Sequence, residues 1–254
     1  MSKRALVMLG SGETSPTMVT PHQEIIKEVG KSSRRILLDT PYGFQTNADD
    51  LTARMLHYFD FNVGYKAEAI EFRDTTQEVN EEIESADWVF SGPGSPTYAL
   101  RVWSESKTAD AFKKLLGHGT LVLSSAAAIS AGSFSLPVYE IYKVGQSPFW
   151  MEGLNLLEAS TGLKAAVIPH YNNAEGGSHD TSCCFVGEKR LSLLENMLPD
   201  DVFILGIDEH TGVRFDLEEE VASVFGRGAM TIRMGGEMWQ VQTGSTVPFA
   251  EIAA

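Results

Sequence analysis

The chain has 254 residues, of which 43% are apolar and 21% charged, a composition typical of a globular protein with a sizeable core. Its 34 acidic and 20 basic residues give a formal net charge of −14, which disfavours nucleic acid and anionic membranes as partners. The apolar run before Gly10 is too short for a secretory signal or a membrane span, so it predicts a buried first strand.

Short apolar or β-branched runs alternate with patterns of helical period along the chain. The predicted strands lie at 5–9, 35–39, 87–92, 120–125, 164–170 and 201–208, and the predicted helices at 47–59, 76–84, 98–116 and 187–198. This alternation indicates a parallel sheet with helices on both faces, in which ligands gather at the carboxyl ends of the strands. From residue 221 the apolar residues alternate and predict an antiparallel hairpin or meander at the sheet edge. No composition break marks a second domain, so we expect one domain over residues 1–254.

Two glycine turns follow predicted strands. GSGE at 10–13 lacks the glycine spacing of a dinucleotide site and the Lys-Ser/Thr ending of a phosphate loop, so nucleotide binding has little support. In SGPGSPTY at 91–98, Gly92 and Gly94 let backbone amides approach a substrate atom, as an oxyanion hole requires. A plain strand-to-helix turn with Pro96 at the first helical position explains the same residues equally well.

The stretch TLVLSSAAAISAGSF at 120–134 holds the candidate nucleophiles. A strand, a sharp turn that exposes a serine and then a helix form a nucleophile elbow, which usually has glycine two residues before and after the serine. Ser125 lies at the strand end, but Leu123 and Ala127 occupy those two positions. Ser130 matches the glycine pattern better, yet it lies five residues farther on, beyond the expected reach of the strand. Position favours Ser125, and the alternative is that no serine is catalytic.

A candidate base follows the next predicted strand, in PHYNNAEGGSHDTSCC at 169–184. His170 falls at the strand end, where a general base is expected. A metal site built from His170, Glu175, His179, Asp180 and Cys183 is the competing interpretation. The nine-residue spacing of the two histidines matches no common ligand pattern, so no metal is expected.

Candidate acids follow the last predicted parallel strand, in LGIDEHTG at 205–212. Asp208 and Glu209 can each offer a carboxylate to orient an imidazole, and His210 is a competing base. Strand alternation sends the two acidic side chains to opposite faces, so only one can point at His170. The two cysteines, Cys183 and Cys184, are adjacent and seldom form a disulfide in that arrangement, which predicts reduced thiols and a cytoplasmic location.

In chain order, the glycine turn at 92–94, a serine after the next strand, PHYNN and GIDEHT resemble the alpha-aspartyl dipeptidase and cyanophycinase family of serine peptidases. The most specific elements are SPTYAL, PHYNNAEGG and GIDE. The resemblance implies an α/β fold of the class I glutamine amidotransferase-like, flavodoxin-like type: a three-layer sandwich with a mostly parallel central sheet and a C-terminal antiparallel hairpin. It also implies a triad of Ser125, His170 and Glu209, with Ser125-Ala126-Ala127-Ala128 at the place of the family's Ser-Ala-Gly-Ala.

The function implied by the resemblance is hydrolysis of a small peptide, isopeptide or amide without a cofactor. Amide transfer is disfavoured, because glutamine amidotransferases of this fold have a cysteine where this chain has Ser125. The alternative is a catalytically lapsed amidotransferase-like protein that binds a small amino-acid-like ligand. The sequence leaves open whether the protein forms a homo-oligomer. The oxyanion hole is assigned to the amides of Gly94 and Ala126, and substrate binding to Gly92, Ser95, Asn172, Asn173 and Glu175.

Overall fold

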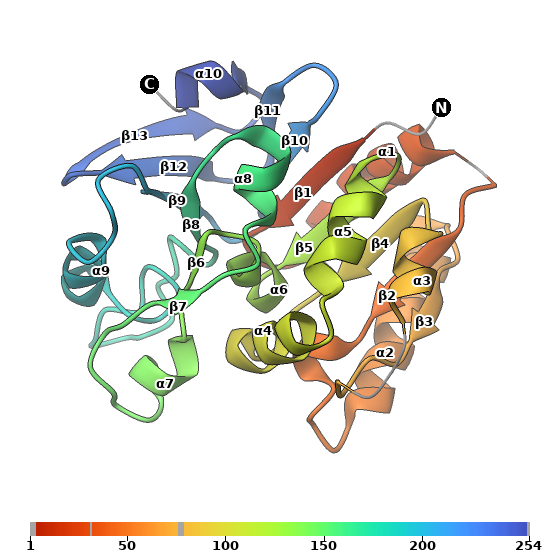
Figure 1. The fold of residues 1–254 in the computed structure, drawn as a ribbon, viewed down its shortest axis with the longest axis horizontal. Coiled ribbons are helices and arrows are strands. Elements are labelled where there is room, and N and C mark those ends of the chain that lie inside the picture. The colour runs from red at the N-terminus through yellow and green to blue at the C-terminus, as the bar shows by residue number, and fades with distance from the viewer. Residues whose placement is uncertain (1–3, 31, 76–78, 253–254) are drawn as a thin grey trace.

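The computed structural model describes residues 4–30, 32–75 and 79–252, whose strands form two sheets (Figure 1). In spatial order, the eight-stranded sheet contains β14 (Thr246–Pro248), β11 (Val221–Gly226), β10 (Thr211–Asp216), β1 (Ala5–Leu9), β5 (Thr120–Ser124), β4 (Trp88–Ser91), β2 (Arg35–Leu38) and β3 (Glu68–Ile70). The six-stranded sheet contains β13 (Glu237–Gln242), β12 (Ala229–Met234), β9 (Phe203–Ile207), β8 (Ala165–Ile168), β6 (Phe134–Ser135) and β7 (Met151–Glu152).

The eight-stranded sheet has a parallel half that is covered by helices on both faces. From β1 through β5, β4 and β2 to β3 every neighbouring pair is parallel. Leu6 and Met8 of β1 pack into one apolar cluster, and Val7 and Leu9 pack into another on the opposite face. A strand buried on both faces reads as the continuous apolar run seen in the sequence. The three-layer α/β class predicted from the sequence is therefore confirmed.

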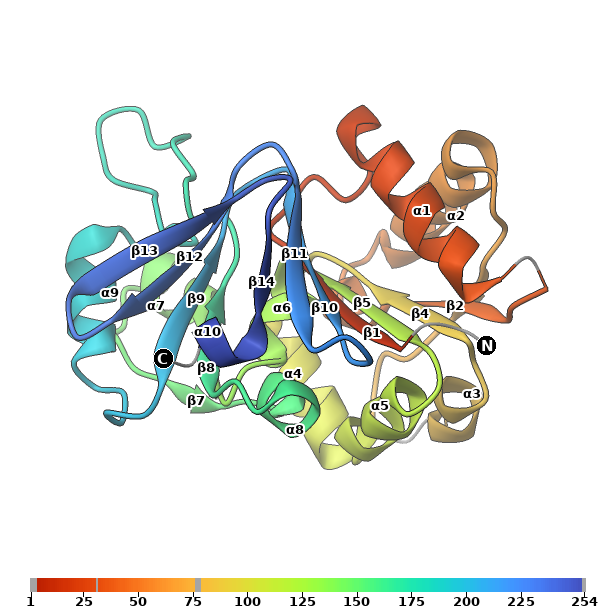
Figure 2. The same cartoon turned by 90° about the horizontal axis from the view of Figure 1, so that it is seen from above.

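Helices α1 (Val19–Val29) and α2 (Ala48–His57) cover one face of this sheet, and α3 (Asn80–Glu84), α4 (Pro96–Glu105) and α5 (Thr108–Leu116) cover the other (Figure 2). The remaining α-helices are α6 (Ala126–Ser130), α7 (Val138–Tyr142), α8 (Leu156–Thr161), α9 (Glu188–Glu195) and α10 (Phe249–Ile252). Three short helices of other types are η1 (Pro16–Met18), η2 (Thr40–Tyr42) and η3 (Tyr58–Val63). Within the described ranges, no helix combines the length and apolar character that crossing a membrane requires.

Two predicted helices differ from the observed ones. The helix predicted at 98–116 is divided between α4 and α5, because Lys107 adopts a left-handed conformation with φ of 57°. The helix predicted at 47–59 continues past α2 into η3, a π-helical segment. Residues 76–78 of the helix predicted at 76–84 lie outside the described residues, and α3 forms the rest.

The C-terminal strands are shared between the two sheets, whereas the sequence predicted them at the edge of a single sheet. β10, β11 and β14 extend the eight-stranded sheet, and the β12–β13 hairpin extends the six-stranded one. Gly235 and Gly236 form the predicted hairpin turn with φ values of 60° and 81°. Leu205 and Ile232 of the six-stranded sheet pack in the same cluster as Leu6, so the two sheets share a core. The division follows from this packing, which alternation alone does not specify.

Candidate active site

Ser125 occupies the turn between β5 and α6. Its φ of 50° and ψ of −114° lie outside the regions that non-glycine residues ordinarily adopt. Such strain is stored where surrounding structure holds it, and here the Ser125 amide donates to the carbonyl of Leu9 at 3.0 Å. The backbone thus has the sharp strand-to-helix turn of a nucleophile elbow.

The residues that replace the usual glycines fit without relaxing this turn. Leu123 is fully buried in the main core cluster, and its backbone pairs with Met8 of β1. Ala127 is also fully buried, and its amide faces the carbonyl of Gly92 at 3.3 Å. Because the Leu123 side chain points into the core, its bulk fills space there and leaves the Ser125 turn strained.

A continuous hydrogen-bonded chain runs from Ser125 to Glu209. Ser125 Oγ lies 2.9 Å from His170 Nε2, and His170 Nδ1 lies 2.8 Å from Glu209 Oε1. His170 follows β8 with φ of 49°, and its amide donates to the carbonyl of Gly10 at 3.2 Å. The adjacent carbonyls of Leu9 and Gly10, at the end of β1, therefore hold the serine and the histidine.

Two asparagines hold Glu209, Asn173 at its carboxylate and Asn172 at its backbone amide. Asn173 is buried and donates from Nδ2 to Glu209 Oε1 at 2.9 Å, and Asn172 Oδ1 accepts from the Glu209 amide at 2.8 Å. Burial alone would raise the pKa of Glu209, but the hydrogen bonds from His170 and Asn173 outweigh it and lower the pKa below its ordinary value. The carboxylate facing His170 is thus kept ionised.

Asp208 is turned away from His170. Its Oδ2 accepts from the Ala229 amide at 2.9 Å on the neighbouring strand β12. Burial raises its pKa, partly offset by that hydrogen bond, and the charge of Glu209 raises it further. Of the two acids predicted at this strand end, Glu209 is the one that contacts the imidazole.

Gly94 and Ala126 line a small cavity of about 50 Å³ together with Ser125 and His170. Gly94 has φ of 146°, and a Cβ placed there would lie 2.0 Å from the carbonyl oxygen of Pro41, so only glycine fits. Gly94 and Ala126 therefore line the same cavity as Ser125.

The competing side chains have other contacts. Ser130 is buried in α6 and its hydroxyl donates to the Ala126 carbonyl at 3.4 Å. His210 Nδ1 lies 3.3 Å from Ser15 Oγ. Asp180 accepts from the backbone amides of Ser182 and Glu188. Among the described residues no cluster of three metal-ligating side chains forms.

The cysteines lie close to the site but are poorly suited to replace the serine. Cys184 lines the same cavity as Ser125, and burial raises its pKa far above the ordinary value. Burial also raises the pKa of Cys183 to about 11. Because the thiolate is the nucleophilic form, neutral thiols leave Ser125 as the candidate nucleophile.

Several predicted substrate-binding residues have structural contacts. Ser95 caps α4 by accepting from the Tyr98 amide at 3.2 Å, and Gly92 accepts from Ala127. Asn172 and Asn173 hold Glu209 as described above. Glu175 is exposed, and its amide donates to Asn173 Oδ1 at 3.2 Å.

A second cavity, of about 460 Å³, adjoins the first through Gly94 and Tyr139, which line both. Its walls include Glu13, a buried carboxylate that accepts from the Ser124 hydroxyl at 2.9 Å, and the exposed side chain of Arg54. Sequence reasoning missed both charged residues. Glu13 lies in the GSGE turn, which was compared only with nucleotide-binding motifs. Arg54 lies on a predicted helix, where no pattern distinguishes it from a solvent-exposed charge.

Solved structures show the same fold. The crystal structure of a peptidase from an acI-B1 Actinobacterium matches with a TM-score of 0.75 at 19% identity, covering 97% of each chain. A putative peptidase E protein from Listeria monocytogenes EGD-e matches with a TM-score of 0.54 at 14% identity, covering 96% of this chain and 100% of that one. A search of functionally curated proteins found no match.

A family match over most of the chain defines the class of protein, a serine-type peptidase or hydrolase. The chain belongs to peptidase family S51, whose family model matches residues 6–221. This is the alpha-aspartyl dipeptidase and cyanophycinase family that the sequence motifs resemble, so that prediction is confirmed.

Proposed function

We propose that this serine peptidase cleaves a small peptide, isopeptide or amide bond with Ser125 as nucleophile, His170 as general base and Glu209 as the orienting acid. The observation that carries the proposal is the chain of hydrogen bonds of 2.9 and 2.8 Å that joins the three side chains. Nucleophile, base and orienting group within hydrogen-bond reach are the signature of an activated serine.

In the first half of the reaction, Ser125 Oγ attacks the carbonyl carbon while His170 Nε2 takes the hydroxyl proton. Glu209 accepts from Nδ1–H, which keeps Nε2 free as the acceptor and stabilises the imidazolium that forms. The amides of Gly94 and Ala126 donate to the developing oxyanion. The C–N bond then breaks, His170 gives its proton to the leaving amine, and an ester on Ser125 remains.

In the second half, His170 Nε2 takes a proton from water, which attacks the ester carbonyl. The second oxyanion uses the same two amides. When the C–O bond to Ser125 breaks, His170 returns the proton to the serine oxygen, and the acid product leaves. The cycle uses only groups of this chain and water.

The adjoining cavity supports a short substrate. Its volume of about 460 Å³ lies within the range of small-molecule sites, which runs from about 300 to 1,000 Å³. Glu13 and Arg54 supply one anionic and one cationic group at its wall, a combination suited to a substrate that carries both charges. Gly94 lines both this cavity and the smaller one around Ser125, which supports a substrate that reaches from Glu13 and Arg54 to the serine.

Two further expectations belong to the same proposal. The shared core of the two sheets supports one domain over residues 1–254. Cys183 and Cys184 are free and buried, which supports a reducing, cytoplasmic location.

The competing hypothesis of a lapsed binding protein rested on Leu123 and Ala127, and it loses that argument because Ser125 keeps its strained conformation.

A fluorophosphonate probe, which modifies only activated serines, tests the proposal without knowledge of the substrate. We expect wild-type protein to be labelled, Ser125→Ala to lose both labelling and amide hydrolysis, and Ser130→Ala to keep both. Ser130 is a matched control because it lies on the adjoining helix and its hydroxyl bonds only within α6. Labelling that persists in Ser125→Ala and disappears in Ser130→Ala would show that the wrong serine was chosen.

A further inference from the structure

The six-stranded sheet has one long edge that lacks the usual protection. β13 forms this edge with six residues, EMWQVQ, and it contains neither proline nor lysine. The other edge strands in the described ranges are shorter: β14 has three residues and ends in Pro248, β3 has three, and β7 has two. Natural sheets protect their edges with short strands, proline or lysine, and β13 uses none of these.

The hairpin turn determines which backbone groups of β13 face outward. Met234 and Glu237 close a two-residue turn, and in such a hairpin the closing residues form a hydrogen-bonded pair. Because bonded and non-bonded pairs alternate, the odd-numbered residues of β13 bond to β12. The amide of Thr243 donates to the Gly228 carbonyl at 3.1 Å, in agreement with this alternation. The outward-facing N–H groups therefore belong to Met238, Gln240 and Gln242. The outward-facing C=O groups left for a partner belong to Met238 and Gln240, because the Gln242 carbonyl accepts from the Ser245 amide at 3.1 Å.

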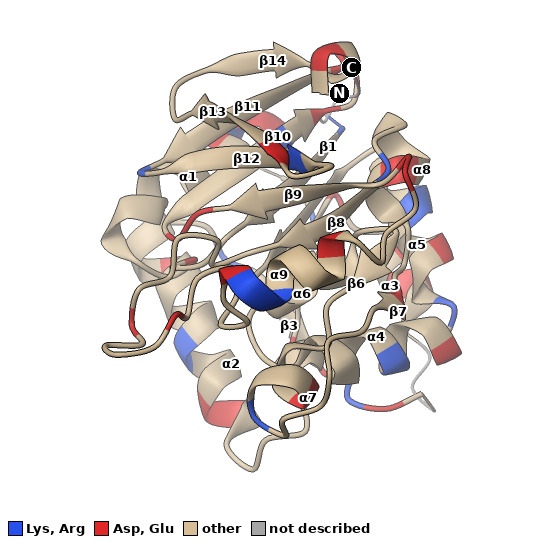
Figure 3. Cartoon of the chain, turned by 90° about the vertical axis from the view of Figure 1, so that its left-hand side faces the viewer, with Lys and Arg blue, Asp and Glu red and all other residues tan. Residues whose placement is uncertain are grey.

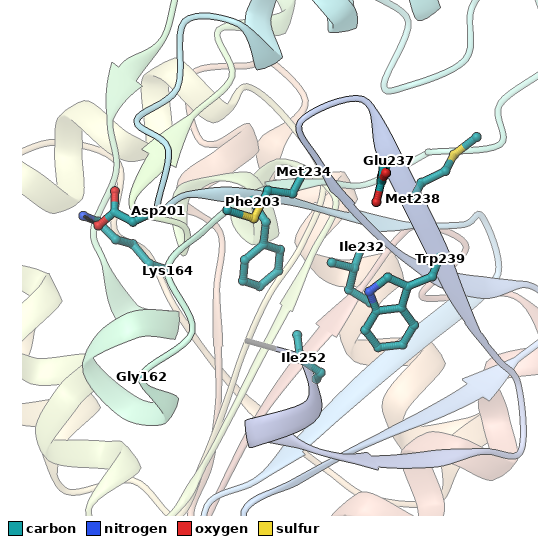
Figure 4. A pocket seen from close by; sticks show the side chains of 10 residues that line it. All are labelled: Gly162, Lys164, Asp201, Phe203, Ile232, Met234, Glu237, Met238, Trp239 and Ile252. Atoms are coloured by element: carbon teal, nitrogen blue, oxygen red, sulfur yellow. Dashed lines mark hydrogen bonds and ion pairs between the residues drawn. The ribbon is translucent and has the colours of Figure 1, made fainter. Parts of the chain in front are cut away.

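Two large apolar side chains of this edge are exposed. Met238 is 66% exposed and Trp239 is 41% exposed. Figure 4 shows Trp239 and Ile252 beside a cavity of about 630 Å³. None of the residues that line this cavity lines the cavity around Ser125. Large apolar side chains next to unpaired backbone groups are typical of a surface that another strand covers.

The edge is also electrically neutral on a strongly acidic protein. Residues 228–249 contain one arginine and one glutamate, so their net charge is zero, against −14 for the whole chain. Figure 3 shows β12 and β13 mostly in tan, the colour of uncharged residues. Two copies of this chain would repel each other over most of their surfaces, and at this edge the repulsion is weakest.

We propose that β13 pairs antiparallel with β13 of a second copy, about a twofold axis perpendicular to the sheet. Centring the pair on Gln240 brings all three outward-facing residues into use: Gln240 faces the partner's Gln240, and Met238 faces the partner's Gln242. The central pair makes two bonds, and each outer pair makes one, from the Gln242 amide to the partner's Met238 carbonyl, because the Gln242 carbonyl already accepts from the Ser245 amide at 3.1 Å; the contact therefore has four backbone bonds. The twofold axis keeps each face continuous, so Trp239 lies opposite the partner's Val241, on the same face of the joined sheet.

The size of the contact predicts a reversible dimer. One pair of strands about 20 Å long with a few exposed side chains belongs to the small interfaces, below about 1,200 Å². Such contacts are weak, so we expect monomers at low concentration and dimers in the upper micromolar range. Sedimentation velocity across a concentration series measures this equilibrium directly.

Gln240→Pro removes the central outward N–H without removing a backbone bond to β12, and it also removes the side-chain bond from Gln240 Nε2 to Thr231 Oγ1 on β12. Trp239→Lys leaves that bond in place and adds a charge to each side of the contact. We expect both changes to raise the dimer dissociation constant by at least about tenfold. Phe61→Lys is the matched control, because Phe61 is 73% exposed on η3 and lies outside the edge. Circular dichroism establishes that each variant is folded.

Amide hydrogen exchange gives a second readout that needs no variant. The amides of Gln240 and Gln242 should gain protection as the concentration rises, while those of Trp239 and Val241 are protected at every concentration. Wild-type protein that stays monomeric through the upper micromolar range overturns the proposal. A dimer in which the amides of Gln240 and Gln242 exchange freely also overturns it. A dimer whose dissociation constant is unchanged by Gln240→Pro and Trp239→Lys overturns it as well, because such a dimer forms through another surface.

Discussion

Replacement of Glu209 by glutamine removes one charge from the site and keeps its shape. The glutamine oxygen can still accept from His170 Nδ1, so the tautomer is kept and only the attraction to the imidazolium is lost. A carboxylate about 4 Å from that cation contributes about 4 kcal/mol at an effective dielectric constant of 20. The two side chains are 18% and 26% exposed, which lowers the contribution to roughly 2–3 kcal/mol, or about 30- to 160-fold in rate.

The rate of fluorophosphonate labelling measures this loss at the serine itself. Asp208→Asn is the matched control, since it removes the neighbouring carboxylate and retains an oxygen that can accept from Ala229. We expect Glu209→Gln to slow labelling by the stated factor and Asp208→Asn to leave it within about threefold. Equal loss in both variants, or a Glu209→Gln variant as fast as wild type, would refute the assignment of Glu209.

Two further predictions concern stability and the oxyanion hole. Burial lowers the pKa of His22 to about 4, against 6.5 when unfolded, so between these values the unfolded chain binds more protons and stability falls as the pH falls. From pH 7 to pH 4 denaturant melts should show wild type losing about 3 kcal/mol more than His22→Gln, and equal losses would contradict this. Gly94→Ala should lower both the melting temperature and the labelling rate, because its Cβ would lie 2.0 Å from the Pro41 carbonyl oxygen. Gly64→Ala controls for backbone strain alone, since it has φ of 84° and open space around the new Cβ; a Gly94 variant as stable and active as this control would exclude the clash.

Much of the fold could be predicted from buried strands. Runs such as Ala5–Leu9 and Thr120–Ser124 are apolar because both faces of these strands are covered, and an uninterrupted apolar run can be recognised in the sequence. The separation into two sheets was not visible, because strand pairing depends on contacts between distant segments. The break at Lys107 was missed for a similar reason: the pattern around it has helical period, and the left-handed residue is held by its surroundings.

The candidate site likewise has parts that the sequence predicts and parts that it does not. Ser125 and His170 could be proposed because each follows a strand whose end falls at the shared edge of the core. Strand position left Asp208 and Glu209 open, and the choice of Glu209 came from the family resemblance. The contacts between the supporting residues could not be predicted: Asn173 was expected to bind substrate, and its bond to Glu209 was not foreseen. That bond joins loops 36 residues apart, and no local pattern encodes it.

The carbonyls at the end of β1 have a consequence for how the enzyme acquires its activity. Leu9 holds Ser125 from the eight-stranded sheet, and Gly10 holds His170 after a strand of the six-stranded one, while the Gly10 amide donates to Thr211. During synthesis, Ser125 is made before the other two residues of its proposed triad, His170 and Glu209. The contacts of the first strand are complete only after the segment that contains Thr211 has been synthesised. Under the proposed mechanism, activity therefore requires both sheets to be formed and packed together.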